Sequence, residues 1–490
     1  MPSESDRTLL NALLAAPPDA HALRAERPDG ALRYGELAHA SARLAGQLRK
    51  RHALQPGDRV GLLLPPGPGF VATLVALWRL RCAVVVLTPL HPEAERARLL
   101  DDAGARLVVD EHELNACAEA ADEPALDVTP TSDDLALLVY TSGTTSRPKG
   151  VMLRHRHLSA QCDAIASAWG IRPDDVLVHA LPLHHVHGLI IALLSTLSVG
   201  GSARMLPRFE PGAVLAACAD ATLFMAVPTM IARLVEHLDA LPERERVVAA
   251  DALARLRLCV SGSAALPASL GQRWEGLSGS YPLERFGMTE LGVALSNRIE
   301  LRVPGSVGWP LPGVETRVVA DGHPVGDAEA VEGELQVAGP TVFDGYWQRP
   351  EIDAEAFADA GGVRWFRTGD TVRREADGRF TVLGRSSVDI LKSAGYKLSA
   401  LQIEEAIRRH EAVRDAAVVG LPDETYGQVV AAAVIPRSGE RLDTEALLTF
   451  LRGELAPYQL PRRVKLVADL PRNALGKVRK PDLVSRWDDL

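Results

Sequence analysis

The strongest constraint on the fold is an alternation of short apolar runs and helical patterns between about residues 30 and 340. RVGLLLPPG (59–67) predicts a strand that ends in a turn, and GFVATLVALWRLR (69–81) has apolar residues at helical spacing. Further β-rich segments are CAVVVLTPL, ARLVVD, LALLVY, SARMLP, ATLFMAVP and LRLCVSGSA, several of them separated by helices such as PTMIARLVEHLDAL. Because such alternation buries parallel strands between helices, the sequence predicts an α/β architecture of layered, parallel-rich sheets.

The pattern changes twice towards the C-terminus. Over about residues 305–384, glycine-punctuated strands such as GELQVAGP and GRFTVLGR predict a β-rich subdomain. After Arg385, a helix–strand alternation that includes LQIEEAIRRHEAV and QVVAAAVIP predicts a small α+β domain. We therefore expect a large N-terminal domain over residues 1–384 and a small C-terminal domain over residues 388–490, with the boundary at GRSSVD.

Composition narrows the functional classes. The formal net charge is −9, from 54 basic and 63 acidic residues, which argues against generic nucleic-acid binding. The five cysteines lack metal-binding spacing, so we expect buried thiols in a reducing compartment. No signal-peptide pattern opens the chain, and arginines interrupt the apolar run FVATLVALWRLRCAVVVL. We expect a soluble cytoplasmic protein that binds neither nucleic acid nor membranes.

Two polar loops follow predicted strands: YTSGTT after LALLV and SGSAALP after LRLCV. The carboxyl ends of buried parallel strands are where such sheets bind ligands, so these loops predict a shared pocket. In YTSGTTSRPKGVML (140–153), the glycines, the hydroxyls and Lys149 are suited to holding phosphate. The loop is not a Walker A motif, because Pro148 stands where its second glycine should be and Gly150 follows Lys149.

The loop resembles the phosphate-binding signature of adenylate-forming enzymes, the superfamily of acyl-CoA synthetases, luciferase and peptide-synthetase adenylation domains. In that family's order come LPLHHVHG, SGSAALP, RFGMTE, GYWQRPE, WFRTGD, GRSSVDILKSAGYKLSALQIEEAI and PRNALGKVRK, so the resemblance covers nearly the whole chain. HHVHGL, FMAVPTM, ERFGMTELGVALSN and VPGSVGWPLPGV look most similar to malonyl-CoA synthetases.

The resemblance implies a two-step reaction with ATP, Mg²⁺ and coenzyme A. A carboxylate attacks the α-phosphorus of ATP to give acyl-AMP and pyrophosphate, and a thiol then displaces AMP. The implied phosphate-binding residues are Thr141, Ser142, Gly143, Thr144, Thr145 and Lys149. Implied contacts to AMP come from Ser263, Ala264, Arg285, Phe286, Gly287, Met288, Thr289, Asp370 and Arg385, with Phe286 stacked on adenine and Asp370 accepting both ribose hydroxyls. Glu290 would hold Mg²⁺ through a hard oxygen ligand.

The implied catalytic residues are Lys477, Thr289, Glu290 and His185. Lys477 resembles the lysine that bridges the substrate carboxylate and the phosphate, and it can reach the phosphate loop only if the small domain closes over the large one. The family is thought to rotate that domain about a hinge, here residues 385–387 with Ser387 as the pivot. The rotation would bring in Ser393, Gly395, Tyr396 and Lys397 for the thioester step. The chain departs from the family at Ser146, Ser387 and Ala394.

The acid is predicted from two arginines. A malonate or methylmalonate carries a second carboxylate, whose burial requires a cation. Arg233, after FMAVPTM, and Arg285 are expected at the wall of the acyl pocket, with His185 and His187 at its border. Alternatively, Arg285 pairs with Glu284 and Arg233 faces solvent.

Other functions stay open on the sequence alone. The acid could instead be another short-chain or aromatic carboxylic acid, or the acceptor could be a carrier protein. A scaffold that has lost catalysis would show decay at Lys149, Glu290, Asp370 or Lys477, and all four are intact. The oligomeric state, monomer or homodimer, is not determined by the sequence.

Overall fold

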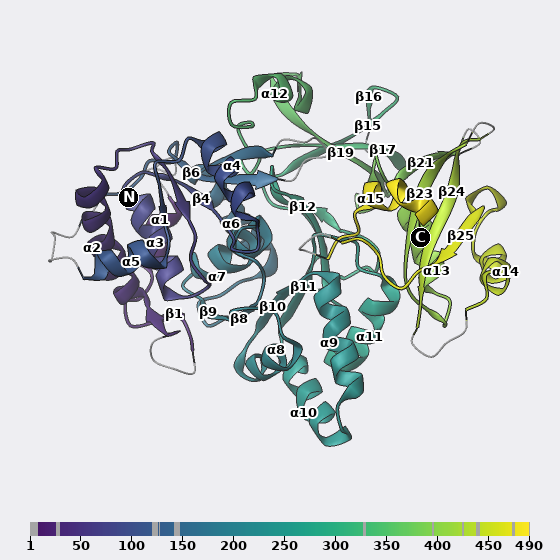
Figure 1. Cartoon of the computed structure of the whole chain (residues 1–490), viewed down its shortest axis with the longest axis horizontal. Coiled ribbons are helices and arrows are strands. Elements are labelled where there is room, and N and C mark those ends of the chain that lie inside the picture. Colours follow the sequence, from purple (N-terminus) through teal and green to yellow (C-terminus); the bar gives the residue numbers. More distant parts are fainter. Residues whose placement is uncertain are drawn as a thin grey trace.

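The computed structural model describes residues 8–25, 30–119, 126, 128–141, 148–326, 330–393, 396–423, 426–437, 442–472 and 476–489. Its sheets follow one another along the longest axis of the molecule, from the N-terminal part to the yellow-green C-terminal part (Figure 1). The predicted α/β class with parallel-rich sheets is confirmed.

The first sheet has the strand order β5-β3-β4-β6-β7. The strands are β3 (Arg59–Leu62), β4 (Ala83–Val86), β5 (Leu107–Val109), β6 (Leu135–Thr141) and β7 (Lys149–Arg154). All pairs are parallel except β6–β7, which is antiparallel and places Thr141 opposite Lys149. The helices of this region are α1 (Leu9–Ala15), α2 (Tyr34–His52), α3 (Pro68–Arg79), α4 (Glu93–Ala103), α5 (Glu111–Ala118) and α6 (His155–Trp169).

The second sheet carries most of the candidate site and has the order β14-β13-β12-β11-β10-β8-β9-β1-β2. Its strands are β1 (His21–Leu23), β2 (Leu32–Arg33), β8 (Val176–His179), β9 (Ser202–Met205), β10 (Leu223–Ala226), β11 (Leu258–Ser261), β12 (Leu283–Met288), β13 (Gly292–Ser296) and β14 (Trp309–Pro310). β8 to β12 are joined by parallel pairs, and β12–β13 is antiparallel. β12 therefore lies where parallel pairing ends, and a short turn after it leads into the antiparallel strand β13.

Helices of this second region include α8 (Pro211–Ala217), α9 (Pro228–Ala240), α10 (Glu243–Ala254) and α11 (Ala268–Ser278). A π-helix covers His187–Leu194, followed by α7 (Ser195–Leu197). α9 begins with Pro228 at a position where proline is favoured, and its buried residues recur at helical spacing: Met230, Ile231, Leu234, Val235 and Leu238. That pattern predicted the helix.

The third sheet is antiparallel, with the order β16-β15-β17-β19-β18 and β20 paired to β19. Its strands are β15 (Glu315–Ala320), β16 (His323–Val325), β17 (Val331–Ala338), β18 (Phe357–Ala360), β19 (Val363–Arg374) and β20 (Phe380–Arg385), with α12 (Pro350–Ala356) before β18. These strands are those expected of the β-rich segment.

The C-terminal part is built on a sheet with the order β22-β21-β24-β23, with β25 paired to β24. Its elements are β21 (Ile390–Ser393), β22 (Tyr396–Ser399), α13 (Ala400–Arg408), β23 (Val413–Asp423), β24 (Gly427–Pro436), α14 (Thr444–Glu454), β25 (Arg463–Leu466) and α15 (Lys480–Ser485). Two hydrophobic clusters made only of residues from 391 onwards cover the faces of this sheet, while another large cluster draws its members from Leu9 to Phe380.

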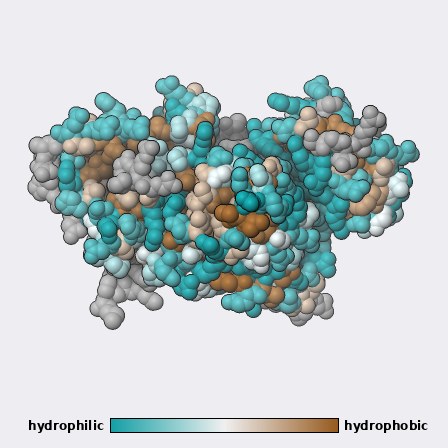
Figure 2. Space-filling view, turned by 90° about the horizontal axis from the view of Figure 1, so that it is seen from below, coloured by the Kyte–Doolittle hydropathy of each residue, from teal (hydrophilic) through white to brown (hydrophobic). Residues whose placement is uncertain are grey.

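The face in Figure 2 is mostly hydrophilic, with several apolar groups between the hydrophilic residues, one of them near its centre. All five cysteines are buried thiols, as predicted. In the described part of the chain, no helix combines the length and the apolar content that crossing a bilayer requires.

Candidate active site

Asp370 and Arg385 lie directly opposite each other on the antiparallel strands β19 and β20. The Arg385 Nε atom is 3.3 Å from Asp370 Oδ1, and the guanidinium also donates to the Thr368 carbonyl oxygen. Burial raises the pKa of Asp370 to about 6, although the positive charges of Arg385 and Lys477 oppose this rise. The structure therefore brings together the two residues expected to bind ribose, in a strand rather than in a turn.

Lys477 comes from the C-terminal part, and its positive charge acts on the Asp370 carboxylate. The preceding Gly476 packs against Thr229 in the first turn of α9, where an added Cβ atom would lie 2.6 Å from Thr229 Oγ1. The C-terminal part also contacts α11, where the Ala268 amide donates a hydrogen bond to Glu405 Oε1 over 3.1 Å. In this arrangement the charge of Lys477 reaches one of the residues predicted to bind the nucleotide, and the catalytic role of Lys477 stays a prediction.

Tyr346 contacts both Lys149, through its ring, and Glu290, through its hydroxyl. Tyr346 Oη donates to Glu290 Oε1 over 2.9 Å, and Lys149 Nζ lies 5.4 Å from the centre of the Tyr346 ring. Because Glu290 is only 7% exposed, its carboxylate needs such a donor. Sequence reasoning assigned no role to Tyr346, although GYWQRPE contained it.

The phosphate loop is described only at its two ends, Thr141 and Lys149, which are paired across β6 and β7. The predicted loop residues Ser142, Gly143, Thr144 and Thr145 lie outside the described residues, as does Ser146. After the loop, Gly150 accepts the Trp347 amide over 2.7 Å, so β7 is tied to the segment that carries Tyr346.

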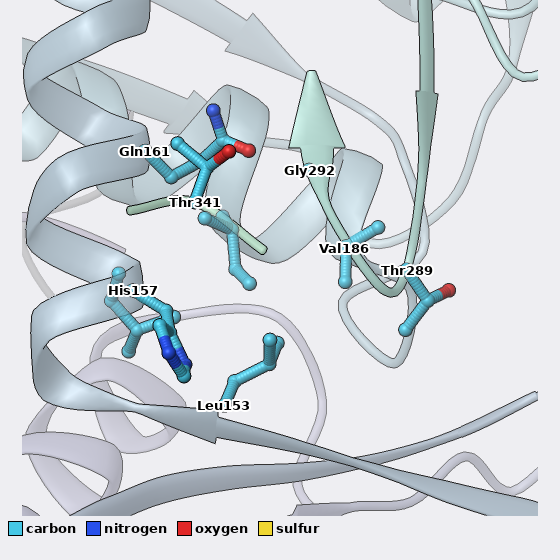
Figure 3. A pocket seen from close by; sticks show the side chains of 9 residues that line it. Leu153, His157, Gln161, Val186, Thr289, Gly292 and Thr341 are labelled. Atoms are coloured by element: carbon cyan, nitrogen blue, oxygen red, sulfur yellow. The ribbon is translucent and has the colours of Figure 1, made fainter. Parts of the chain in front are cut away.

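The end of β12 and the turn after it present Phe286, Gly287, Met288 and Thr289, all half-buried. A Cβ atom on Gly287 would overlap the Gly292 carbonyl, so only glycine allows this close approach. Behind the turn lies a small cavity between Thr289 and Gly292, on the hairpin, and Gln161, on α6 (Figure 3). Gln161 Oε1 accepts the Val293 amide over 2.7 Å, which fixes the hairpin to α6.

Arg285 is the most unusual charge of the site. It is 5% exposed, and its Nε and Nη2 atoms have no hydrogen-bond partner among the described residues. Burial lowers its pKa to about 10, so it remains a cation at neutral pH. The guanidinium lies against Gly262, where any Cβ atom would overlap it. Its neighbour in sequence, Glu284, instead accepts the Gly305 amide over 2.8 Å.

Ser263 and His187 border the Arg285 guanidinium. Ser263 has a φ of 68°, an uncommon left-handed conformation for a residue other than glycine, in the loop predicted to line the adenine pocket with Ala264. His187 Nδ1 is 3.0 Å from Ser263 Oγ, and burial together with Arg285 lowers the pKa of His187 well below its ordinary value. The structure thus joins His187, Ser263 and Arg285.

His185 is a neutral imidazole at physiological pH, because burial lowers its pKa to about 4. Its ring centre is 4.1 Å from that of His184, which in turn meets the His91 ring edge-on at 5.4 Å. A role for His185 in catalysis stays a prediction, and it would have to be that of an uncharged group.

Arg233 is exposed on α9, one helical turn after Thr229, and its guanidinium lies 4.9 Å from the centre of the Phe209 ring. The contact found for Arg233 is therefore an aromatic ring, as the solvent-facing alternative allowed. Its role as a carboxylate ligand stays a prediction.

The residues expected in the hinge and the thioester step lie between β20 and β22. Ser387 is exposed in the turn after β20. Ser393 pairs with Tyr396 across β21 and β22, while Gly395 and Ala394 lie outside the described residues. Tyr396 and Lys397 are exposed, and the Tyr396 ring stacks on Tyr458 with centres 4.3 Å apart.

Comparisons with known proteins identify the family to which the chain belongs. Residues 11–347 match the family described as AMP-binding enzyme, and residues 402–477 match the AMP-binding enzyme C-terminal domain. A relative from Mus musculus, named a mitochondrial malonate–CoA ligase, is 39% identical over 92% of this chain and 86% of its own length.

Two solved structures are informative. ATP-bound MatB from Rhodopseudomonas palustris has a TM-score of 0.90 and 32% identity, covering 99% of both chains. A malonyl-CoA ligase in a ternary product complex with methylmalonyl-CoA and AMP has a TM-score of 0.66 and 38% identity, covering 94% of this chain and 100% of its own. The resemblance inferred from the motifs is confirmed, and the chain belongs to the AMP-binding enzyme family.

Proposed function

We propose that the chain is an ATP-dependent malonate–CoA ligase, which forms malonyl-AMP and pyrophosphate and then malonyl-CoA and AMP. The observation that carries the proposal is the buried guanidinium of Arg285, whose Nε and Nη2 donors, beside the loop Gly262–Ser263, are unpaired among the described residues. A buried, unpaired cation is costly unless a ligand completes the pair. The distal carboxylate of malonate is such a ligand, and the malonate–CoA ligase name of the mouse relative supports it.

The charged side chains of the site suit the adenylation step, the first half of the reaction. The reacting carboxylate oxygen of malonate forms a bond to the α-phosphorus, and the bond from that phosphorus to the bridging oxygen of pyrophosphate breaks. Lys477, whose charge acts on Asp370, would hold the reacting carboxylate against the α-phosphate, and Lys149 with the loop after Thr141 would hold the departing pyrophosphate. Asp370 and Arg385 would orient the ribose, and Phe286 the adenine.

Glu290 is the residue that would hold Mg²⁺. The described residues contain no group of three or more His, Cys, Asp or Glu side chains that could hold a metal by themselves. Mg²⁺ commonly takes one or two carboxylates and completes its shell with substrate phosphates and water, so a single buried carboxylate fits. When bound, Mg²⁺ would neutralise charge on the phosphates. Tyr346 holds the carboxylate in place through Oε1.

For the second half-reaction we propose a domain rotation. The two domains would be residues 1–384, with the β-rich subdomain at about 305–384, and residues 388–490, moving about residues 385–387. The TM-score with the ATP-bound MatB structure is higher than that with the product complex, although the sequence identity is lower. This difference supports a different domain arrangement after adenylation. The rotation would replace Lys477 with the segment of Ser393, Gly395, Tyr396 and Lys397.

Methylmalonate is the closest competing acid, because one methyl group is worth only about 1–3 kcal/mol of discrimination. We propose CoA as the acceptor rather than a carrier protein, which the product complex of the neighbour supports. A cytoplasmic location stays a prediction, since the mouse relative is named a mitochondrial protein.

The test is pyrophosphate release over a panel of acids, with CoA and a carrier protein compared as acceptors. The proposal expects malonate or methylmalonate to give the highest kcat/KM, with CoA as acceptor. Turnover of a monocarboxylate without turnover of malonate would refute the assigned acid. Lys477→Ala should abolish adenylation but spare the transfer of the acyl group from pre-formed malonyl-AMP to CoA.

A further inference from the structure

Lys480, three residues after Lys477, is a buried lysine between two carboxylates. Its Nζ atom lies 2.5 Å from Asp389 Oδ1 and 2.7 Å from Glu404 Oε1, and the residue is 7% exposed. Burial lowers the pKa of Lys480, but Glu404 and Asp389 raise it by more, so the amine stays charged. Leaving either carboxylate would leave a buried charge uncompensated, so both hold the amine in place.

The carboxylates continue into a row of alternating charges. Glu404 Oε2 is 3.3 Å from Arg408 Nη2, one turn later on α13. Arg408 Nε is 2.9 Å from Asp415 Oδ1 on β23, and Asp415 Oδ2 accepts from Arg472 Nη2. Arg472 therefore stands at one end of the row, and Lys480 with its partner Asp389 at the other.

The two ends of the row hold the two ends of the loop that carries Lys477. Arg472 Nη1 donates to the Gly476 carbonyl oxygen over 2.7 Å, directly before Lys477. The Arg479 amide donates to the Pro471 carbonyl over 2.7 Å, and a backbone bridge joins Arg472 to Val478. The loop base is thus closed by backbone bonds and clamped on both sides by side-chain charges.

The same row reaches the ribose-binding pair. Asp389 Oδ2 accepts the Arg385 amide over 3.0 Å, and the Arg385 guanidinium pairs with Asp370. Asp389 thus contacts both Lys480 and Arg385, and Arg385 is predicted to bind the nucleotide. Lys477 is therefore linked to Asp370 and Arg385, the pair predicted to bind ribose, through side-chain contacts as well as through the backbone.

We infer that Lys480 and Arg472 are positioning residues, which hold the loop so that Lys477 meets the reacting carboxylate and the α-phosphate. The inference rests on the proposed function, in which Lys477 acts in adenylation. A lysine side chain is long and flexible, and displacement of a reacting group by about 1 Å can cost on the order of 100-fold in rate, so anchoring its backbone matters.

The inference predicts an effect confined to one half-reaction. Every charge of the row, from Asp389 to Lys480, follows Ser387, so a rotation about the proposed hinge would carry the row as one body. The thioester step would use the segment around Tyr396 instead of Lys477. Damage to the row should therefore slow adenylation and leave the thioester step unchanged.

The experiment uses the double variant Lys480→Met/Glu404→Gln in the full chain. It removes one positive and one negative charge together, so no new net charge is buried. We expect adenylation, measured as malonate-dependent exchange of pyrophosphate into ATP, to lose roughly 10- to 100-fold in kcat with little change in the KM for ATP. Thioester formation from pre-formed malonyl-AMP should be unchanged, and Lys480→Arg should keep most of the adenylation rate.

The matched control is Arg409→Met/Glu454→Gln, which removes another ion pair of the C-terminal part, 3.0 Å long, neither member of which belongs to the row. It should change neither half-reaction. Equal losses in both half-reactions of the Lys480 double variant, or no loss in adenylation, would overturn the inference.

If the double variant does not fold, Arg472→Lys tests the other end of the row. It keeps the cation beside Asp415 but lacks the forked donors needed to reach the Gly476 carbonyl as well. A selective loss of adenylation is expected, and an unchanged rate would refute the inference. Lys477→Ala separates the two proposals: if it abolishes adenylation while the row variants do not, only the positioning role fails.

Discussion

Replacement of Arg285 by methionine should separate substrate binding from stability. The change removes a guanidinium that is 5% exposed and fills the space with an unbranched apolar chain. Removing one partner of a buried ion pair costs about 3–5 kcal/mol, so kcat/KM for malonate should fall by roughly 10²- to 10⁴-fold. A monocarboxylate such as butyrate makes no use of the cation, so its kcat/KM should stay the same or rise.

The free enzyme should respond in the opposite direction. In the absence of malonate, Arg285 Nε and Nη2 have no partner among the described residues, so the wild-type protein carries an uncompensated buried charge. Replacing such a charge by an apolar residue can stabilise the fold, and about 1–4 kcal/mol is the range seen for buried ionic groups. Urea unfolding should show a higher midpoint with an unchanged slope.

The assay is pyrophosphate release with malonate and with butyrate, run in parallel on both proteins. The control is Arg298→Met, because Arg298 is exposed and stacks on the Trp309 ring at 4.6 Å without lining the site. Parallel losses with both acids, or a loss of free-enzyme stability in Arg285→Met, would refute the assignment of Arg285 as the ligand of the distal carboxylate.

Further predictions concern the neighbours of this residue and the nucleotide. Gly262→Ala should displace the Arg285 guanidinium, because the added Cβ atom would overlap it, and so lower kcat/KM for malonate more than for butyrate; equal effects would contradict this. Adenosine, which carries no phosphate, should bind more weakly below about pH 6, because burial raises the pKa of Asp370 to about 6 and the protonated acid cannot accept both ribose hydroxyls. Calorimetry from pH 5 to 8 (roughly the range over which Asp370 titrates) tests this, with Asp370→Asn expected to be flat across it. Tyr346→Phe removes the hydroxyl that donates to Glu290, a hydrogen bond to a charged group worth about 1.5–3 kcal/mol, and should raise the Mg²⁺ concentration needed for adenylation; an unchanged Mg²⁺ titration would argue against this role.

Much of the site could be predicted because its residues follow strand ends and lie in ordered motifs. Ser263 follows β11, and Glu290 lies in the turn after β12, as local patterns indicated. Tyr346 was missed because nothing local distinguishes a tyrosine that bonds a distant glutamate from one that packs in a core. The contact between Gly262 and Arg285 was missed for the same reason, since it joins neighbouring parallel strands.

The sequence by itself determined the class of fold, the order of the elements and the kind of chemistry, because these depend on residue periodicity and on motifs that are short and ordered. It left open which of the charged side chains meet. Tertiary structure decided that the charge of Lys477 acts on Asp370, and that Arg285 is buried with no partner for Nε and Nη2 among the described residues while Arg233 stacks on a ring. It also decided that Lys480 joins a row of charges beside the loop that carries Lys477. The physical reason is that an ion pair depends on distance and burial, which are set by strand register and by packing between segments far apart in the chain.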